Sequence, residues 1–197
     1  MNTFLPYSDF DKSAQVLDSK RLVKQNLETR QILNTLCGFS EGWRNHPAVL
    51  QWKGCIRALI YYGLAINEEC IKRGFKNSEN QHRKYLDYCI ENKLNEEYPK
   101  WLGDEAIHSS HRSRLICKGL IDVYCDALKR KLKFKKIDIF IKEHFNKTKN
   151  ALKWEDVPLL EKLIKNFNAQ EFVKPNFYNK FGWTDDPSKP YIWPKKT

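Results

Sequence analysis

The sequence lacks the features that mark several large classes of protein. No stretch of about eighteen apolar residues is free of charge, so we expect no transmembrane helix. The first residues hold no basic start followed by an apolar run, so we expect no secretory signal. The six cysteines form no Cys-x-x-Cys pair, which disfavours structural zinc and predicts reduced thiols in an intracellular compartment, the cytoplasm or the nucleus. Walker loops, dinucleotide fingerprints, HExxH motifs and nucleophile elbows are also missing.

Positive charge is the main compositional signal. The chain has 197 residues, is 41% hydrophobic and 13% aromatic, and carries a formal net charge of +11. Its length fits one domain with an extension, and its hydrophobic content excludes disorder. Residues 129–153 alone hold ten Lys or Arg and two acids, a local charge of +8. Such an excess favours a polyanionic partner such as DNA, although lysine-rich surfaces also serve solubility alone.

The periodicity of apolar residues predicts an all-α protein, because they recur at three and four and no strand-like alternation is present. A first helix is expected over 18–37, capped by Asp18 or Ser19. Its inward side is predicted to be Val23, Leu27, Leu33 and Leu36. Its outer face is predicted to be polar, with Arg21, Lys24, Gln25, Glu28 and Gln31.

The remaining pattern predicts a single compact helical domain with a helical insertion. A long rod is expected from His46-Pro47 to Gly74, followed by helices over 79–93 and 104–118. Further helical patterns lie near 120–131, 136–147 and 155–167. We therefore expect a core over 1–118, a lysine-rich helical extension over 119–172 packed on the same domain, and an extended aromatic, proline-punctuated tail over 173–197.

Glu28 is the first candidate for chemistry, since it is the one acid on an otherwise cationic and amide-rich helix face. A carboxylate among cations stays ionised, which suits stabilising a cationic intermediate or moving a proton. The alternative is a solvated helix salt bridge with Lys24, four residues earlier.

The segment 101–118 is the second candidate. Its cations, among them Arg112, Arg114 and Lys118, suit phosphate binding, and an ordinary polar helix surface is the alternative. His108 and His111 stand three residues apart, but no third ligand follows at a metal-binding spacing, so we expect no metal. The aromatic tail could stack on bases, while for Tyr191 and Trp193 we favour packing against the chain's own core.

Two segments carry a family resemblance. HPAVLQWKGCIRALIYYGLAINEECIKRGF and WLGDEAIHSSHRSRLICK, with the first-helix frame of Leu17, Leu22 and Glu28, resemble the pyrimidine-dimer DNA glycosylases of the phage endonuclease V type. The chain looks closest to a branch that begins with TFLPY-like residues, here Thr3 to Tyr7, and ends in PYxWP, here Pro190 to Pro194. The resemblance covers roughly 1–118 and the last eight residues.

The resemblance implies a helical enzyme that acts on double-stranded DNA without metal or organic cofactor, and we expect a monomer. In the family the N-terminal amine attacks the sugar's anomeric carbon, a Schiff base forms and β-elimination breaks the strand. Here the amine would be that of Met1, and Glu28 would match the assisting glutamate. Extrusion of a nucleotide is the expected access route. The expected DNA contacts are Arg21, Lys24, Arg30, His111, Arg112, Arg114 and Lys118.

The chain also departs from the family pattern. Residue 2 is Asn instead of the threonine that methionine removal exposes, so we expect Met1 to be retained. Leu27 and Gln31 stand where the family has two arginines, and Arg21 where it has a histidine. Two other hypotheses therefore stay open. One is a non-catalytic DNA-binding protein that keeps the fold, and the other is a nuclease or hydrolase that uses His108 and His111.

Overall fold

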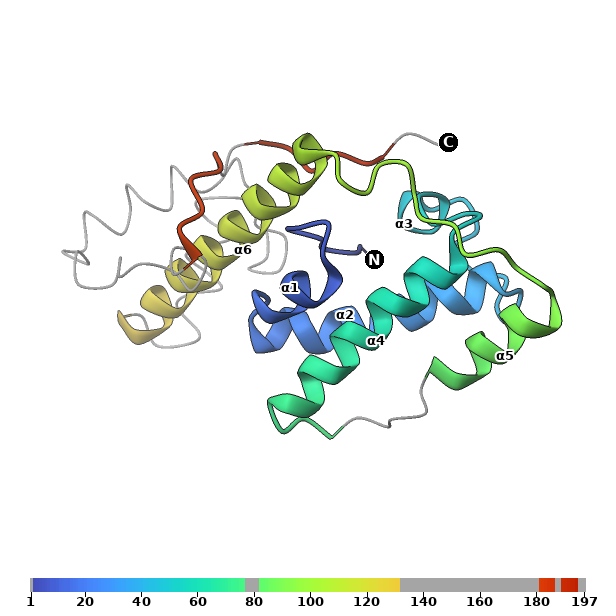
Figure 1. Cartoon of the computed structure of the whole chain (residues 1–197). Coiled ribbons are helices and arrows are strands. Elements are labelled where there is room, and N and C mark those ends of the chain that lie inside the picture. Colours follow the sequence, from blue (N-terminus) through green and yellow to red (C-terminus); the bar gives the residue numbers. More distant parts are fainter. Residues whose placement is uncertain (1, 77–81, 132–180, 187–188, 195–197) are drawn as a thin grey trace. The chain divides into compact units, whose positions relative to one another are not determined.

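The described part of the chain is all helical, which confirms the predicted fold class. A computed structural model describes residues 2–76, 82–131, 181–186 and 189–194, and in these ranges it contains six α-helices and no strand (Figure 1). The helices are α1 (Phe10–Gln15), α2 (Ser19–Leu36), α3 (Pro47–Leu50), α4 (Ile56–Lys72), α5 (Arg83–Glu91) and α6 (Glu105–Lys131). No helix in these ranges is long and apolar enough to cross a membrane.

The chain divides into two units, each described by itself. The first unit is Met1–His111 with Tyr191–Thr197, and the second is Arg112–Pro190. The predicted helices over 136–147 and 155–167 and most of the lysine-rich extension lie outside the described residues. The pattern near 120–131 belongs to α6, which continues without a break where two helices were expected.

In the first unit, α2 and α4 pack side by side and form the core, α1 packs on α4, and α5 also contacts α4 (Figure 1). The side chains between these helices are fully buried, and they include Leu22, Ile32, Leu33, Leu59, Ile60 and Ile66. The start of α2 is the predicted one, because the carboxylate of Asp18 accepts a hydrogen bond from the Arg21 amide at 2.9 Å.

The predicted orientation of α2 is right for Leu33, which is buried, and for Lys24, which is exposed, but it is wrong for four other side chains in a way that matters for function. Val23 and Leu27 were expected inside, and they are 45% and 48% exposed. Gln25 and Glu28 were expected on the outer face, and they are only 1% and 6% exposed. The physical reason is that the N-terminal segment lies along this face and supplies polar partners for both side chains.

The predicted single rod from His46 to Gly74 is also wrong. Helix α3 ends at Leu50, and α4 begins at Ile56 after a turn that contains Gly54 at a φ of +85°. The turn buries Trp52, whose indole nitrogen donates to the Thr3 hydroxyl at 3.1 Å. The predicted helix over 79–93 is shorter than expected, because α5 spans Arg83–Glu91.

Candidate functional site

Glu28 lies beside the beginning of the chain. The backbone nitrogen of Asn2 donates to Glu28 Oε2 at 3.3 Å, across 26 residues of sequence. The same oxygen accepts a hydrogen bond from Gln25 Nε2 at 3.0 Å. The carboxylate is therefore held by two N–H donors in a nearly water-free position, which fixes its direction.

Gln25 joins the N-terminal segment to this carboxylate with both ends of its amide. Its Oε1 accepts from the Phe4 amide and from the Tyr62 hydroxyl, each at 2.9 Å. Its Nε2 donates to the Asn2 carbonyl at 2.9 Å and to Glu28. Gln25 thus makes four hydrogen bonds from a fully buried position, which is the full capacity of two donors and two of its acceptor sites.

Thr3 is fixed from the opposite side. Its hydroxyl accepts from Gln51 Nε2 at 2.6 Å and from the Trp52 indole at 3.1 Å, and its carbonyl accepts from the Tyr191 hydroxyl at 3.1 Å. Thr3 is 0% exposed. Residues 2–5 are therefore held by partners on α2, on the turn before α4 and on the C-terminal tail.

The two histidines of α6 belong to this support. His108 Nε2 accepts from the Gly103 amide at 3.0 Å, so Nδ1 carries the proton and donates to the Leu5 carbonyl at 2.8 Å. His111 Nδ1 accepts from the Leu5 amide at 2.9 Å. Both rings are buried, and their hydrogen bonds position Leu5. In the part of the chain that the structure describes, no three His, Cys, Asp or Glu side chains gather as a metal site would require.

The TFLPY-like segment at the N-terminus and the PYxWP segment near the C-terminus contact one another. Tyr191, in the PYxWP segment, stacks on His111 with a centroid distance of 4.5 Å and an interplanar angle of 7°. It also meets Phe4 of the TFLPY-like segment edge to face at 6.2 Å. The expectation that Tyr191 packs on the chain's own core is thus confirmed, and the C-terminal segment forms one wall of the Glu28 site.

The electrostatics of the site centre on Glu28. Lys24 Nζ lies 3.8 Å from Glu28 Oε1 with its own side chain 67% exposed. The salt bridge between Lys24 and Glu28 that the sequence offered as the alternative is therefore present, but it is not a solvated one, because its carboxylate is buried. Burial raises the pKa of Tyr62 well above its usual value, with further increases from Tyr191 and Glu28. Burial also raises the pKa of Tyr191. A hydrogen bond with the Asn2 side chain lowers this pKa, and the charge of Glu28 raises it further. Both hydroxyls therefore stay protonated and remain donors.

The predicted cations of α2 occupy three different places. Lys24 lies at the carboxylate. Arg21 Nη1 pairs with Asp18 at 3.0 Å and is 13% exposed. Arg30 donates to the Asn26 carbonyl at 3.4 Å and lowers the pKa values of His82 and Tyr85, which are otherwise governed by burial. The structure thus brings Lys24 to Glu28 and places Arg30 beside α5.

The predicted contacts of α6 fall in two units. His111 belongs to the first unit and is fully buried. In the second unit, Arg112 forms a bidentate pair with Asp185, with its Nε at 2.7 Å and its Nη2 at 3.0 Å from the two oxygens. Arg114 and Lys118 are half-buried in the same unit, and Arg114 Nη1 lies 3.7 Å from Cys117 Sγ. Their contacts with DNA stay a prediction.

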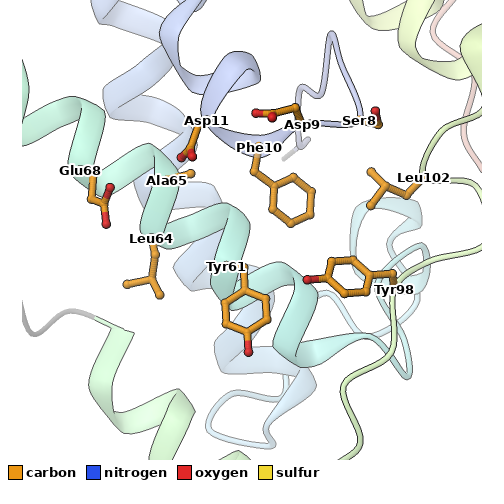
Figure 2. Close-up of a pocket in the computed structure, with 10 residues that line it drawn as sticks. All are labelled: Ser8, Asp9, Phe10, Asp11, Tyr61, Leu64, Ala65, Glu68, Tyr98 and Leu102. Carbon is orange, nitrogen blue, oxygen red and sulfur yellow. The ribbon is translucent and has the colours of Figure 1, made fainter.

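A pocket of the first unit is lined by other residues. About 350 Å³ in volume, it lies between α1 and α4 and is lined by Asp9, Asp11, Glu68, Tyr61 and Tyr98 among others (Figure 2). The carboxylates that line this pocket would repel a DNA phosphate. A second pocket, of about 450 Å³, is lined in part by Arg44, Asn45 and Lys53.

The sequence interpretation missed several residues that build the site, namely Gln25 as an inward group, Thr3, Gln51, Trp52 and Tyr62. Their hydrogen bonds span between 21 and 58 residues of sequence, so no local pattern marks them. One signal in the sequence could have revealed them. The face of α2 that the apolar periodicity assigned to solvent carries amides and a carboxylate, which are groups that bind a buried backbone segment.

Comparison with known proteins agrees with the resemblance. Residues 1–83 match a family model described as pyrimidine dimer DNA glycosylase. The matched range contains Glu28, Gln25, Thr3 and Tyr62, and therefore the hydrogen-bonded centre of the site. Searches among curated proteins and among solved structures gave no significant match. The match supports the resemblance to the pyrimidine dimer DNA glycosylases over residues 1–83, while the segment 101–118 and the last eight residues lie outside the matched range.

Proposed function

We propose that this protein is a DNA glycosylase that releases damaged or modified pyrimidines from double-stranded DNA, with Glu28 as its essential carboxylate. The observation that carries the proposal is the Asn2 amide held 3.3 Å from the buried Glu28 carboxylate. This bond keeps the start of the chain next to a fixed negative charge, which is what an N-terminal amine nucleophile needs. The match of residues 1–83 to the glycosylase family supports the same assignment.

In the proposed reaction the α-amine of Met1 attacks the anomeric carbon of the lesion's sugar, and the glycosidic bond breaks. The base leaves with a proton, and the sugar remains attached as a Schiff base that can undergo β-elimination. An α-amine has a pKa of about 8, so a usable fraction is neutral at physiological pH. Glu28 stabilises the developing cation and moves protons, and Lys24 and the arginines of α2 and α6 hold phosphates.

Glu28→Gln tests the catalytic assignment. The amide retains the shape of the side chain, and its Oε1 can accept from Asn2, but it cannot stabilise a cation or take a proton. We expect at least a hundredfold loss of base release from a duplex containing a cyclobutane dimer, with DNA affinity within about threefold of wild type. The matched control is Glu91→Gln, whose side chain is exposed at the end of α5. Turnover that survives in the Glu28→Gln variant contradicts the assignment.

A second candidate function is a non-catalytic DNA-binding protein that keeps the fold. It is favoured by Leu27 and Gln31, which are both exposed where the resembling family has arginines. Steep salt dependence of DNA binding, with no product from any lesion duplex, would support this alternative. Base release by the wild-type protein excludes it.

A further inference from the structure

A row of aromatic rings leads from the surface of the first unit to its N-terminal segment. Trp43 meets His46 edge to face at 5.4 Å and 80°, and His46 meets Trp193 at 5.9 Å and 86°. The ring centroids of Trp193 and Tyr191 are 4.6 Å apart, and the Tyr191 hydroxyl donates to the Thr3 carbonyl. The row therefore connects the solvent to the buried N-terminal segment. The three outer rings, Trp43, His46 and Trp193, are called the aromatic platform below.

Trp43 is in an unfavourable conformation that folding alone does not explain. Its φ is +67°, in the left-handed region that a bulky side chain rarely adopts, and its side chain is nevertheless 65% exposed. Its one aromatic contact in the described residues is His46. Strain that is kept without burial is typical of functional sites. Trp193 is also partly exposed, at 37%.

The platform is joined by contacts to the segment that holds the proposed catalytic carboxylate. Trp193 packs on Tyr191, whose hydroxyl donates to the Thr3 carbonyl, and the neighbouring Asn2 amide donates to Glu28. Burial lowers the pKa of His46, the N-terminal charge lowers it further, and Glu28 raises it. His46 Nδ1 accepts from the Ala48 amide at 3.1 Å, so the ring is neutral and its orientation is fixed. The loop that carries Trp43 also supplies Arg44 and Asn45 to the pocket of about 450 Å³ that Lys53 lines. Exposed rings next to cations are the arrangement that binds unstacked bases and their phosphates.

We infer that Trp43, His46 and Trp193 form a stacking site for a nucleobase extruded from the duplex beside Glu28. This inference rests on the proposed glycosylase function and adds to it the group that receives the base. It also offers a physical reason why the arginines missing at Leu27 and Gln31 need not abolish recognition, because stacking replaces part of the charge contact.

The test compares Trp43 variants in equilibrium binding to two duplexes, one with a cyclobutane thymine dimer and one undamaged. Trp43→Ala should lose roughly 5- to 150-fold in affinity for the dimer duplex and little for the undamaged one, given the usual contribution of base stacking. Trp43→Phe should recover most of the loss. The control is Tyr98→Ala, which removes a ring that is 50% exposed and stacks on Phe10 at the acidic pocket, and which should leave both affinities unchanged.

Trp43→Gly separates a binding role from a structural one. Glycine adopts the positive φ without strain, so this variant should be at least as stable to urea as Trp43→Ala while binding the dimer duplex equally weakly. Unchanged dimer binding in Trp43→Ala and Trp43→Gly overturns the stacking site. The binding assay needs no turnover, so absence of base release in the wild type would refute the proposed function and leave this inference separately decided by the affinities.

Discussion

Gln25 provides the sharpest test of how the N-terminal segment is held. Gln25→Met removes both ends of the amide and keeps a similar unbranched volume. The Phe4 amide and the Asn2 carbonyl then lose their side-chain partner, while Tyr62 can still donate to the Phe4 carbonyl at 2.9 Å. A buried polar group left without a partner costs about 1–3 kcal/mol, so two of them predict a loss of about 2–6 kcal/mol.

The loss is measurable by urea unfolding and by thermal unfolding. For a chain of this size, 1 kcal/mol corresponds to roughly 2–4 °C, so the midpoint should fall by roughly 4–24 °C. Gln31→Met is the matched control, because Gln31 lies on the same helix with an exposed side chain, and its variant should stay within about 0.5 kcal/mol of wild type. A loss below about 1 kcal/mol in Gln25→Met would refute the four-bond description.

The same variant has a functional consequence. Glu28 loses the donor at 3.0 Å that fixes its direction, and the Asn2 carbonyl loses the Gln25 Nε2 donor. At a temperature where the variant remains folded, kcat for base release should fall more than DNA affinity, because positioning and not phosphate contact is removed. An equal fall in both quantities would show that the damage is general.

Two further predictions concern the packing of α2, α4 and α5. Gly63→Ala should destabilise the fold by about 1–3 kcal/mol in urea unfolding, because the added carbon would lie 2.5 Å from His82 Nε2 and 2.9 Å from Thr29 Cγ2. The control is Gly42→Ala, which should be neutral because the atom nearest to its added carbon is 3.8 Å away. Equal stability of the two variants would contradict this packing. Burial lowers the pKa of His82 from 6.5 to about 4, so on acidification the unfolded chain binds a proton before the folded chain does. The contribution of neutral His82 to the free energy of unfolding should therefore be fully present above pH 6.5. It should fall by up to about 3 kcal/mol as the pH drops to 4. His82→Gln should remove that part of the slope, and an unchanged slope in the variant would assign it to other groups.

The sequence predicted the features that depend on local chemistry. The start of α2 followed from Asp18, whose cap is intrinsic to neighbouring residues. Residues 1–83 match the family that the motifs indicated, while the catalytic role of Glu28, chosen as a carboxylate among cations and amides, stays a prediction. The all-α class followed from the three- and four-residue spacing of apolar side chains.

The errors have a common cause, which is that long-range polar partners override hydrophobic periodicity. Gln25 and Glu28 are inside because residues 2–5 supply their hydrogen bonds, while Leu27 remains outside. The rod from His46 was broken because Trp52 turns inward to reach Thr3. Neither contact leaves a trace in the local sequence, since the partners lie between 23 and 49 residues apart.

Covalent trapping tests the central claim most directly, namely that the beginning of the chain performs chemistry beside Glu28. The protein, with its N-terminus first established by intact mass, is mixed with a duplex carrying an abasic site in the presence of borohydride, and any adduct is mapped by peptide mass. The account predicts a reduced Schiff base on the N-terminal peptide, strongly decreased in Glu28→Gln. An adduct on an internal lysine, or no adduct from a protein that releases the base from a dimer duplex, would contradict the N-terminal amine as the nucleophile.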